Sequence, residues 1–154
     1  MDVEEIMVKK VISIRPEATV REAVQLMNDN EIGCLVVGMK GKNMGIVTER
    51  DVLKRVVSKS KNPEVIQVSE IMSNPVIVGG PHMSVEDATS LMFKKRIKKL
   101  PIMENGHLVG IITLSDIARV AHAEPQIIKV IEELKRKGLL PPKRMKNVVD
   151  MYIT

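Results

Sequence analysis

Two short motifs in this sequence place a threonine and an aspartate three residues apart, directly after a run of aliphatic residues. They span residues 45–51 (Gly-Ile-Val-Thr-Glu-Arg-Asp) and residues 110–116 (Gly-Ile-Ile-Thr-Leu-Ser-Asp). If a helix begins at each threonine, its free backbone N–H groups and partial positive charge suit a phosphate. The aspartate only accepts hydrogen bonds, so it suits paired sugar hydroxyls. The spacing therefore fits a ribose phosphate.

The same spacing has a plainer interpretation. A threonine followed three residues later by an acidic residue is a helix capping box, and Thr19 with Glu22 shows that pattern elsewhere in the chain. Both motifs can therefore be helix caps that bind nothing. Either interpretation places each motif between a strand and a helix.

An internal repeat relates the two motifs. The second copy follows the first at an offset of 65 residues, and the register needs no gap from residues 3 and 68 to residues 51 and 116. Matching segments at this offset include Glu5-Ile6-Met7 with Glu70-Ile71-Met72, Pro16 with Pro81, and Val20 with Val85. One ungapped register over that length indicates two copies of one folding unit.

Each copy predicts the element order β-α-β-β-α, a mixed α/β (α+β) fold. Period and capping in the first copy predict strands over residues 11–14, 33–37 and 44–47, and helices from residue 20 and over residues 51–57. In the second copy, Ser84 opens the first helix and Asn105-Gly106 makes the hairpin turn. The copies are expected to pack about a pseudo-two-fold axis.

The chain beyond the second copy predicts one more helix. Residues 124–137 place Ile127, Ile128, Ile131 and Leu134 on one stripe, and Gly138 is suited to end the helix. Pro141-Pro142 breaks the chain, and residues 143–154 are expected to serve packing or dimer contact. The predicted domains are a first copy (1–58), a linker (59–66), a second copy (67–122) and a C-terminal helical tail (123–154).

The two motifs occur in the same order as the two copies, and each copy also has Ile-Met upstream of its first strand. In these features the sequence resembles the CBS (cystathionine-β-synthase-type) family over residues 3–122. The resemblance implies a tandem pair that dimerises as a disc and has two clefts between its repeats. Such clefts bind AMP, ADP, ATP or, in some members, S-adenosylmethionine. The module then signals the ligand state to a protein effector and performs no chemistry itself.

The resemblance also implies residues for both clefts. In the first cleft, Thr113 would hold phosphate and Asp116 the ribose hydroxyls. The other residues of that cleft would be Ile111, Lys98, Lys99, Met7, Lys10, Ile12, Ile32 and Gly33. The second cleft would use Thr48 and Asp51, with Ile46, Met72, Ile77 and Ile97 as walls.

The two copies differ in charge. Lys98 and Lys99 align with Gly33 and Cys34, so the cleft of Thr113 has local cations that the other cleft lacks unless an arginine reaches it. We expect a charged nucleotide in the first cleft and weaker or different occupancy in the second. The plainer interpretation is a solvated helix end, where lysines are favoured by the helix dipole.

The net charge of +5 is unevenly distributed along the chain. Residues 1–89 hold 11 basic and 13 acidic side chains, whereas residues 90–154 hold 13 and 6. The basic second half supports an alternative function, a nucleic-acid-binding regulator that contacts phosphates through Lys135-Arg136-Lys137 and Lys143-Arg144. No helix with base-reading residues is evident to strengthen that alternative.

Other function classes find little support. The motifs of P-loops, serine hydrolases and zinc proteases do not occur, and we expect no catalytic residue. The three histidines and single cysteine show no metal-ligand spacing, so no metal is expected either. No apolar run approaches the roughly 20 residues of a membrane helix, and the acidic N-terminus is unlike a signal peptide. These features predict a soluble, cytoplasmic chain.

Overall fold

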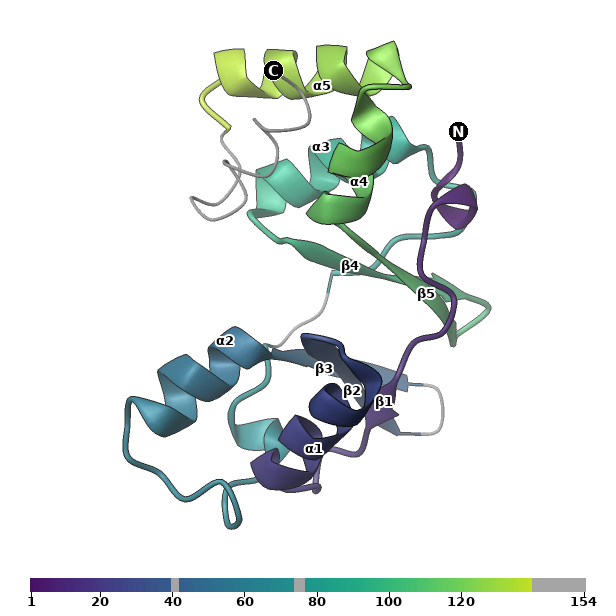
Figure 1. The fold of residues 1–154 in the computed structure, drawn as a ribbon. Helices are drawn as coiled ribbons and strands as arrows, with labels where there is room; N and C mark the ends of the chain where they lie inside the picture. The colour runs from purple at the N-terminus through teal and green to yellow at the C-terminus, as the bar shows by residue number, and fades with distance from the viewer. Residues whose placement is uncertain (40–41, 74–76, 140–154) are drawn as a thin grey trace. The chain divides into compact units, whose positions relative to one another are not determined.

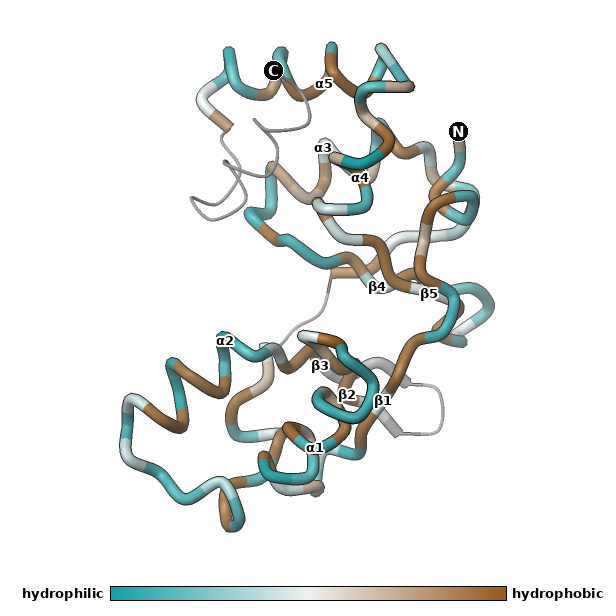
Figure 2. Tube along the Cα trace, viewed as in Figure 1, coloured by the Kyte–Doolittle hydropathy of each residue, from teal (hydrophilic) through white to brown (hydrophobic). Residues whose placement is uncertain are grey.

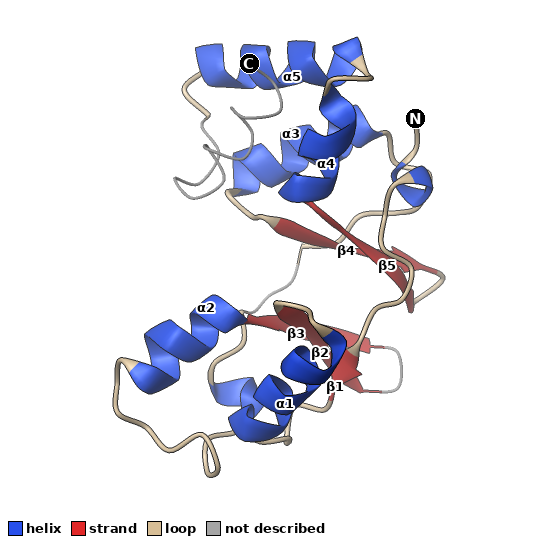
Figure 3. Cartoon of the chain, in the orientation of Figure 1, coloured by secondary structure: helices blue, strands red, loops and turns tan. Residues whose placement is uncertain are grey.

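The computed structural model describes residues 1–39, 42–73 and 77–139, in two compact units. The first-repeat unit consists of Lys10–Ile77 with Gly106–Leu108. The second-repeat unit consists of Met1–Lys9, Val78–Asn105 and the chain from Val109 onward. Each unit combines helices with strands (Figure 1, Figure 3), which confirms the predicted mixed α/β class. No described helix is long and apolar enough to cross a membrane.

The first-repeat unit contains a three-stranded sheet of β1 (Ser13–Ile14), β2 (Cys34–Met39) and β3 (Lys42–Thr48). β1 is parallel to β2, and β2 is antiparallel to β3. Its helices are α1 (Val20–Asn30), α2 (Glu49–Val52), the π-helical turn η2 (Leu53–Val57) and the 3-10 turn η3 (Val68–Glu70). The predicted strand over residues 11–14 is thus shorter in the structure, and the predicted helix over 51–57 begins earlier and changes to π geometry.

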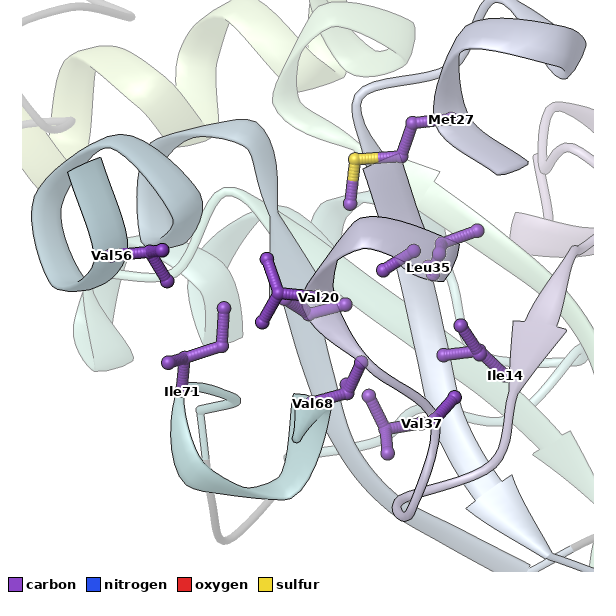
Figure 4. Packing of buried hydrophobic residues seen from close by; sticks show 11 residues of the cluster. Ile14, Val20, Met27, Leu35, Val37, Val56, Val68 and Ile71 are labelled. Atoms are coloured by element: carbon purple, nitrogen blue, oxygen red, sulfur yellow. The ribbon is translucent and has the colours of Figure 1, made fainter. Parts of the chain in front are cut away.

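The core of the first-repeat unit is aliphatic. Val20 and Met27 of α1 pack with Leu35 and Val37 of β2 (Figure 4). Ile71, from the segment after the linker, belongs to the same buried cluster. α1 starts where the sequence predicts, because the Glu22 N–H donates to Thr19 Oγ1 and the Glu22 carboxylate accepts from the Thr19 N–H.

The second-repeat unit contains the 3-10 turn η1 (Val3–Glu5), α3 (Val85–Lys95), the hairpin of β4 (Lys99–Glu104) and β5 (His107–Thr113), and α4 (Leu114–Ala121). Asn105 and Gly106 have φ of 51° and 78°, which suits the predicted two-residue turn. Phe93 is buried, and so are the aliphatic residues Leu100, Ile102 and Ile117 of the same unit.

The predicted extra helix is α5 (Pro125–Arg136), which contacts α3 and α4. Hydrophobic and hydrophilic residues alternate along it (Figure 2). Ile127, Ile131 and Leu134 are buried, and Ile128 is half-buried. Gly138, at φ 80°, follows the helix as predicted. The predictions for Lys40–Gly41, for Val76 and for the tail from residue 140, including Pro141-Pro142 and Lys143-Arg144, lie outside the described residues.

The segment that precedes the first strand of each copy, here called its leading segment, packs in the compact unit of the other copy. The Val3 N–H donates to the Met83 carbonyl (2.9 Å), and the Val68 N–H donates to the Ala18 carbonyl (2.8 Å) at the equivalent position. Residues 1–9 therefore complete the second copy, and residues 66–73 complete the first. The predicted bounds 1–58 and 67–122 describe the copies along the chain. As domain boundaries they stay a prediction, because the compact units exchange these segments.

Candidate functional site

The second motif begins α4 in the second-repeat unit. Asp116 Oδ2 accepts hydrogen bonds from both the backbone N–H and the hydroxyl of Thr113, each at 2.9 Å. Thr113 Oγ1 accepts in return from the Asp116 N–H at 3.2 Å. The capping box that the sequence pattern predicts is thus confirmed, since these bonds form it.

The other carboxylate oxygen of Asp116 is also occupied. Asp116 is only 5% exposed, and its Oδ1 accepts from Nη2 of Arg119, one turn further along α4. The Arg119 side chain itself is 62% exposed. A sugar hydroxyl that donates to Asp116 would therefore replace an arginine that can move into solvent.

Three further predicted residues lie around the start of α4. The Lys98 carbonyl accepts from the Leu114 N–H at 3.0 Å, which places the lysine backbone beside the first turn of the helix. The Met7 side chain covers Gly110, where an added Cβ would collide with its Sδ atom. Ile111 pairs with Val8 through two backbone hydrogen bonds. Met7, Ile111 and Lys98 thus contact residues adjacent to Thr113 along the chain, and Lys99 follows as a half-buried residue.

The first motif builds an equivalent arrangement in the first-repeat unit. Asp51 Oδ2 accepts from the N–H and hydroxyl of Thr48, at 2.9 and 3.1 Å. Ile46 pairs with Ser73 through backbone hydrogen bonds, and the Met72 side chain covers Gly45. The two candidate sites therefore share their scaffold and differ in the side chains placed on it.

The main difference is a charge that sequence reasoning missed. The Gly33 carbonyl accepts from the Glu49 N–H at 3.0 Å, just as Lys98 accepts from Leu114 in the other unit. The Glu49 carboxylate lies over Gly33, because a Cβ built there would be 3.2 Å from Glu49 Cδ. One site thus has a carboxylate beside its helix start, and the other has the backbone of a lysine there. Alignment of Glu49 with Leu114 was the available signal.

Of the arginines near the first motif, Arg55 reaches the aspartate of the motif but is also bonded to backbone carbonyls. Arg55 Nη1 donates to the carbonyls of Ile71 and Met72, at 2.7 and 3.3 Å, and Arg55 Nε is 4.0 Å from Asp51 Oδ1. Arg50 is exposed. The guanidinium of Arg55 therefore forms hydrogen bonds with the backbone of residues 71–72, within its own unit.

The remaining predicted residues divide between the units. Lys10, Ile12, Ile32 and Gly33 belong to the first-repeat unit, whereas their predicted companion Thr113 belongs to the second-repeat unit. Ile77 lies in the same unit as Thr48, and Ile97 lies in the other. Their assembly into two clefts stays a prediction.

The residues proposed for nucleic-acid contact lie on α5 and beyond it. Arg136 and Lys137 are exposed, and Lys137 Nζ is 3.3 Å from the Glu133 carboxylate. That ion pair partly neutralises the basic end of the helix, which weakens the case for phosphate contact there.

Comparison with known proteins matches both copies to one family. The model for the CBS domain matches residues 3–58 and 68–123. A CBS domain-containing protein of Bacillus subtilis is 36% identical over 116 residues, which cover 75% of this chain and 82% of the relative.

Two solved structures are similar as well. A hexameric CBS-CP12 protein from bloom-forming cyanobacteria has a TM-score of 0.75 and 30% identity, covering 99% of this chain and 96% of its own. A CBS domain pair in complex with 5-methylthioadenosine and S-adenosyl-L-methionine has a TM-score of 0.72 and 26% identity, covering 80% and 98%.

Proposed function

Since this chain is a tandem CBS domain pair and belongs to that family, we propose that it is a regulatory module that binds adenosyl ligands. The site at Thr113 takes a phosphorylated nucleotide, AMP, ADP or ATP. The site at Thr48 takes an adenosyl ligand without phosphate, such as S-adenosylmethionine.

The observation that carries this proposal is that residues of opposite charge lie beside the two equivalent helix starts. Lys98 lies beside the start of α4, whereas the Glu49 carboxylate lies over Gly33 at the start of α2. Two unit charges about 4 Å apart interact by roughly 4 kcal/mol at an effective dielectric constant near 20, and by less when solvent reaches them. Lys98 therefore favours an anion, and Glu49 disfavours one.

The choice of adenosyl ligands rests on chemistry and on a relative. The CBS domain pair solved with S-adenosyl-L-methionine and 5-methylthioadenosine binds two ligands that contain adenosine and no phosphate. The sulfonium of S-adenosylmethionine is positive, so the carboxylate of Glu49 suits it. Aspartates that only accept hydrogen bonds suit the ribose hydroxyls common to both ligand classes.

Ligand binding at the second motif would change the start of α4. Ribose hydroxyls that donate to Asp116 would displace the Arg119 guanidinium from Oδ1. The freed arginine can then pair with a ligand phosphate or with a protein effector. A ligand that favours this arrangement shifts the protein toward it, which is how binding would be signalled.

We also propose that the chain acts as a homo-oligomer, most simply a homodimer. Leu53 and Val57 on the helical segment after the first motif are 58% and 62% exposed. A second copy of the chain that packed on this turn would cover both side chains. The hexameric relative shows that a protein of this family can assemble.

The test is calorimetric titration of the full chain with AMP and with S-adenosylmethionine. Lys98→Gln is expected to weaken AMP binding about tenfold, or about 1.4 kcal/mol, and to leave S-adenosylmethionine binding unchanged. Lys94→Gln, an exposed lysine in the last turn of α3, is the matched control. Equal AMP affinity of the two variants would contradict the proposal.

A further inference from the structure

A histidine and two carboxylates from separate parts of the sequence meet on the second-repeat unit. One ligand atom from each of Asp2, Glu4 and His82 lies within 4.8 Å of the others. The backbone holds these residues together, because the Glu4 N–H donates to the Pro81 carbonyl (3.1 Å) and Asp2 pairs with Ser84 as a β-bridge. The cluster therefore does not depend on flexible side chains alone.

The imidazole of His82 lies between two glutamates. Its Nδ1 is 3.6 Å from Glu4 Oε1, and its Nε2 is 3.7 Å from Glu104 Oε1. Both separations exceed an ordinary hydrogen bond. Two ligands at about 2.1 Å from a tetrahedral zinc ion are themselves roughly 3.4 Å apart. The spacing of His82 and Glu4 is thus close to that of two ligands of one ion.

Comparison with the other copy shows that the fold does not require this cluster. The same backbone frame recurs there, since the Ser69 N–H donates to the Pro16 carbonyl as Glu4 does to Pro81. At the offset of 65, however, Asp2, Glu4, His82 and Glu104 correspond to Gln67, Ser69, Glu17 and Met39. Only the second copy combines the imidazole with these carboxylates.

We propose that Asp2, Glu4 and His82 bind a divalent transition-metal ion of the zinc type. His82 would coordinate through Nδ1, and Glu104 would accept a hydrogen bond from Nε2–H to orient the ring. A carboxylate behind the ligating histidine is the usual support of such sites. One nitrogen and carboxylate oxygens suit zinc better than magnesium, which prefers oxygen ligands alone. A bound metal ion would link residues 1–9 to the second copy and stabilise their packing there.

The test is titration of the chelator-treated full chain, without a polyhistidine tag, with Zn²⁺ and separately with Mg²⁺. The wild-type chain is expected to bind one zinc ion and to bind magnesium much more weakly. His82→Gln and Glu4→Gln are expected to abolish the one-to-one binding, and Glu104→Gln to weaken it about tenfold. His122→Gln, which removes an exposed histidine of the same unit, should bind zinc like the wild type.

Two results would overturn the proposal. One is the absence of stoichiometric zinc binding by the wild-type chain. The other is unchanged zinc affinity in His82→Gln when its metal-free melting curve matches that of the wild type. Imidazole ¹⁵N spectra give an independent readout, because zinc should shift Nδ1 of His82 and leave His122 unaffected.

Discussion

At the scale of single residues, the threonine and aspartate of each motif have two tasks. Thr113 and Asp116 satisfy each other as a helix cap, and Thr48 and Asp51 do the same. A cap of this kind contributes to stability whether or not a ligand binds. A loss of stability on mutation is therefore no evidence of a binding site, and the ligand must be varied too.

We predict that Thr113→Ala and Thr48→Ala each lower the free energy of unfolding by about 1 kcal/mol without ligand, because each removes one cap. Saturating AMP should stabilise the wild type and Thr48→Ala alike, since ligand bound to the folded state raises its stability. In Thr113→Ala that gain should be largely lost. Urea unfolding with and without AMP measures both effects. Equal loss of the AMP effect in both variants would contradict the assignment of AMP to the second copy.

At the scale of elements, two glycines allow a leading segment to pack closely on a strand. A Cβ at Gly45 would lie 2.7 Å from the Ser73 carbonyl oxygen, and a Cβ at Gly110 would lie 3.1 Å from the Val8 carbonyl oxygen. The Ser73 carbonyl also accepts from the Ile46 N–H. If the Ser73 carbonyl moved away from a larger residue at position 45, its hydrogen bond with Ile46 would weaken.

We therefore predict that Gly45→Ala destabilises the protein by about 1–3 kcal/mol, the usual range for overpacking. Gly110→Ala should cost less, because a Cβ there would lie 3.1 Å from the nearest carbonyl oxygen, against 2.7 Å at Gly45. Gly80→Ala is the matched control, since nothing lies within 4 Å of a Cβ there. Thermal or urea unfolding of the three variants gives the ranking. A Gly80→Ala variant as unstable as Gly45→Ala would contradict this explanation.

At the scale of the whole molecule, the exchange of leading segments makes each copy of the repeat depend on residues that precede the other. Val3 and Val68 are both 0% exposed and occupy equivalent positions. Val3 belongs to the second-repeat unit, however, and Val68 to the first-repeat unit. The stability of a copy is thus determined partly outside its own stretch of sequence.

This exchange predicts a crossed effect of two matched mutations, each of which buries an unpaired charge. Val3→Asp should increase amide hydrogen exchange in α3 and α4, and Val68→Asp should increase it in α1 and β2. Hydrogen exchange followed by mass spectrometry measures both. If Val3→Asp instead increases amide hydrogen exchange in α1 and β2 alone, each leading segment packs with its own copy. That result would contradict the proposed arrangement of the segments.

The sequence by itself determined the local features of this protein. The repeat, the helix start at Thr19, the Asn105-Gly106 turn and the helix that ends before Gly138 all follow from patterns a few residues long. Such features depend on hydrogen bonds and hydrophobic periodicity between near neighbours, which the sequence states directly. The family likewise followed from the ordered motifs.

Only the tertiary structure decided which distant residues meet. Glu49 lies over Gly33, 16 positions earlier, and His82 lies beside Glu4, 78 positions earlier. These neighbours depend on strand pairing and on the exchanged segments, and contacts between distant residues leave no periodic pattern in the sequence. The motifs therefore predicted where a ligand could bind, and the fold decided which charges would surround it.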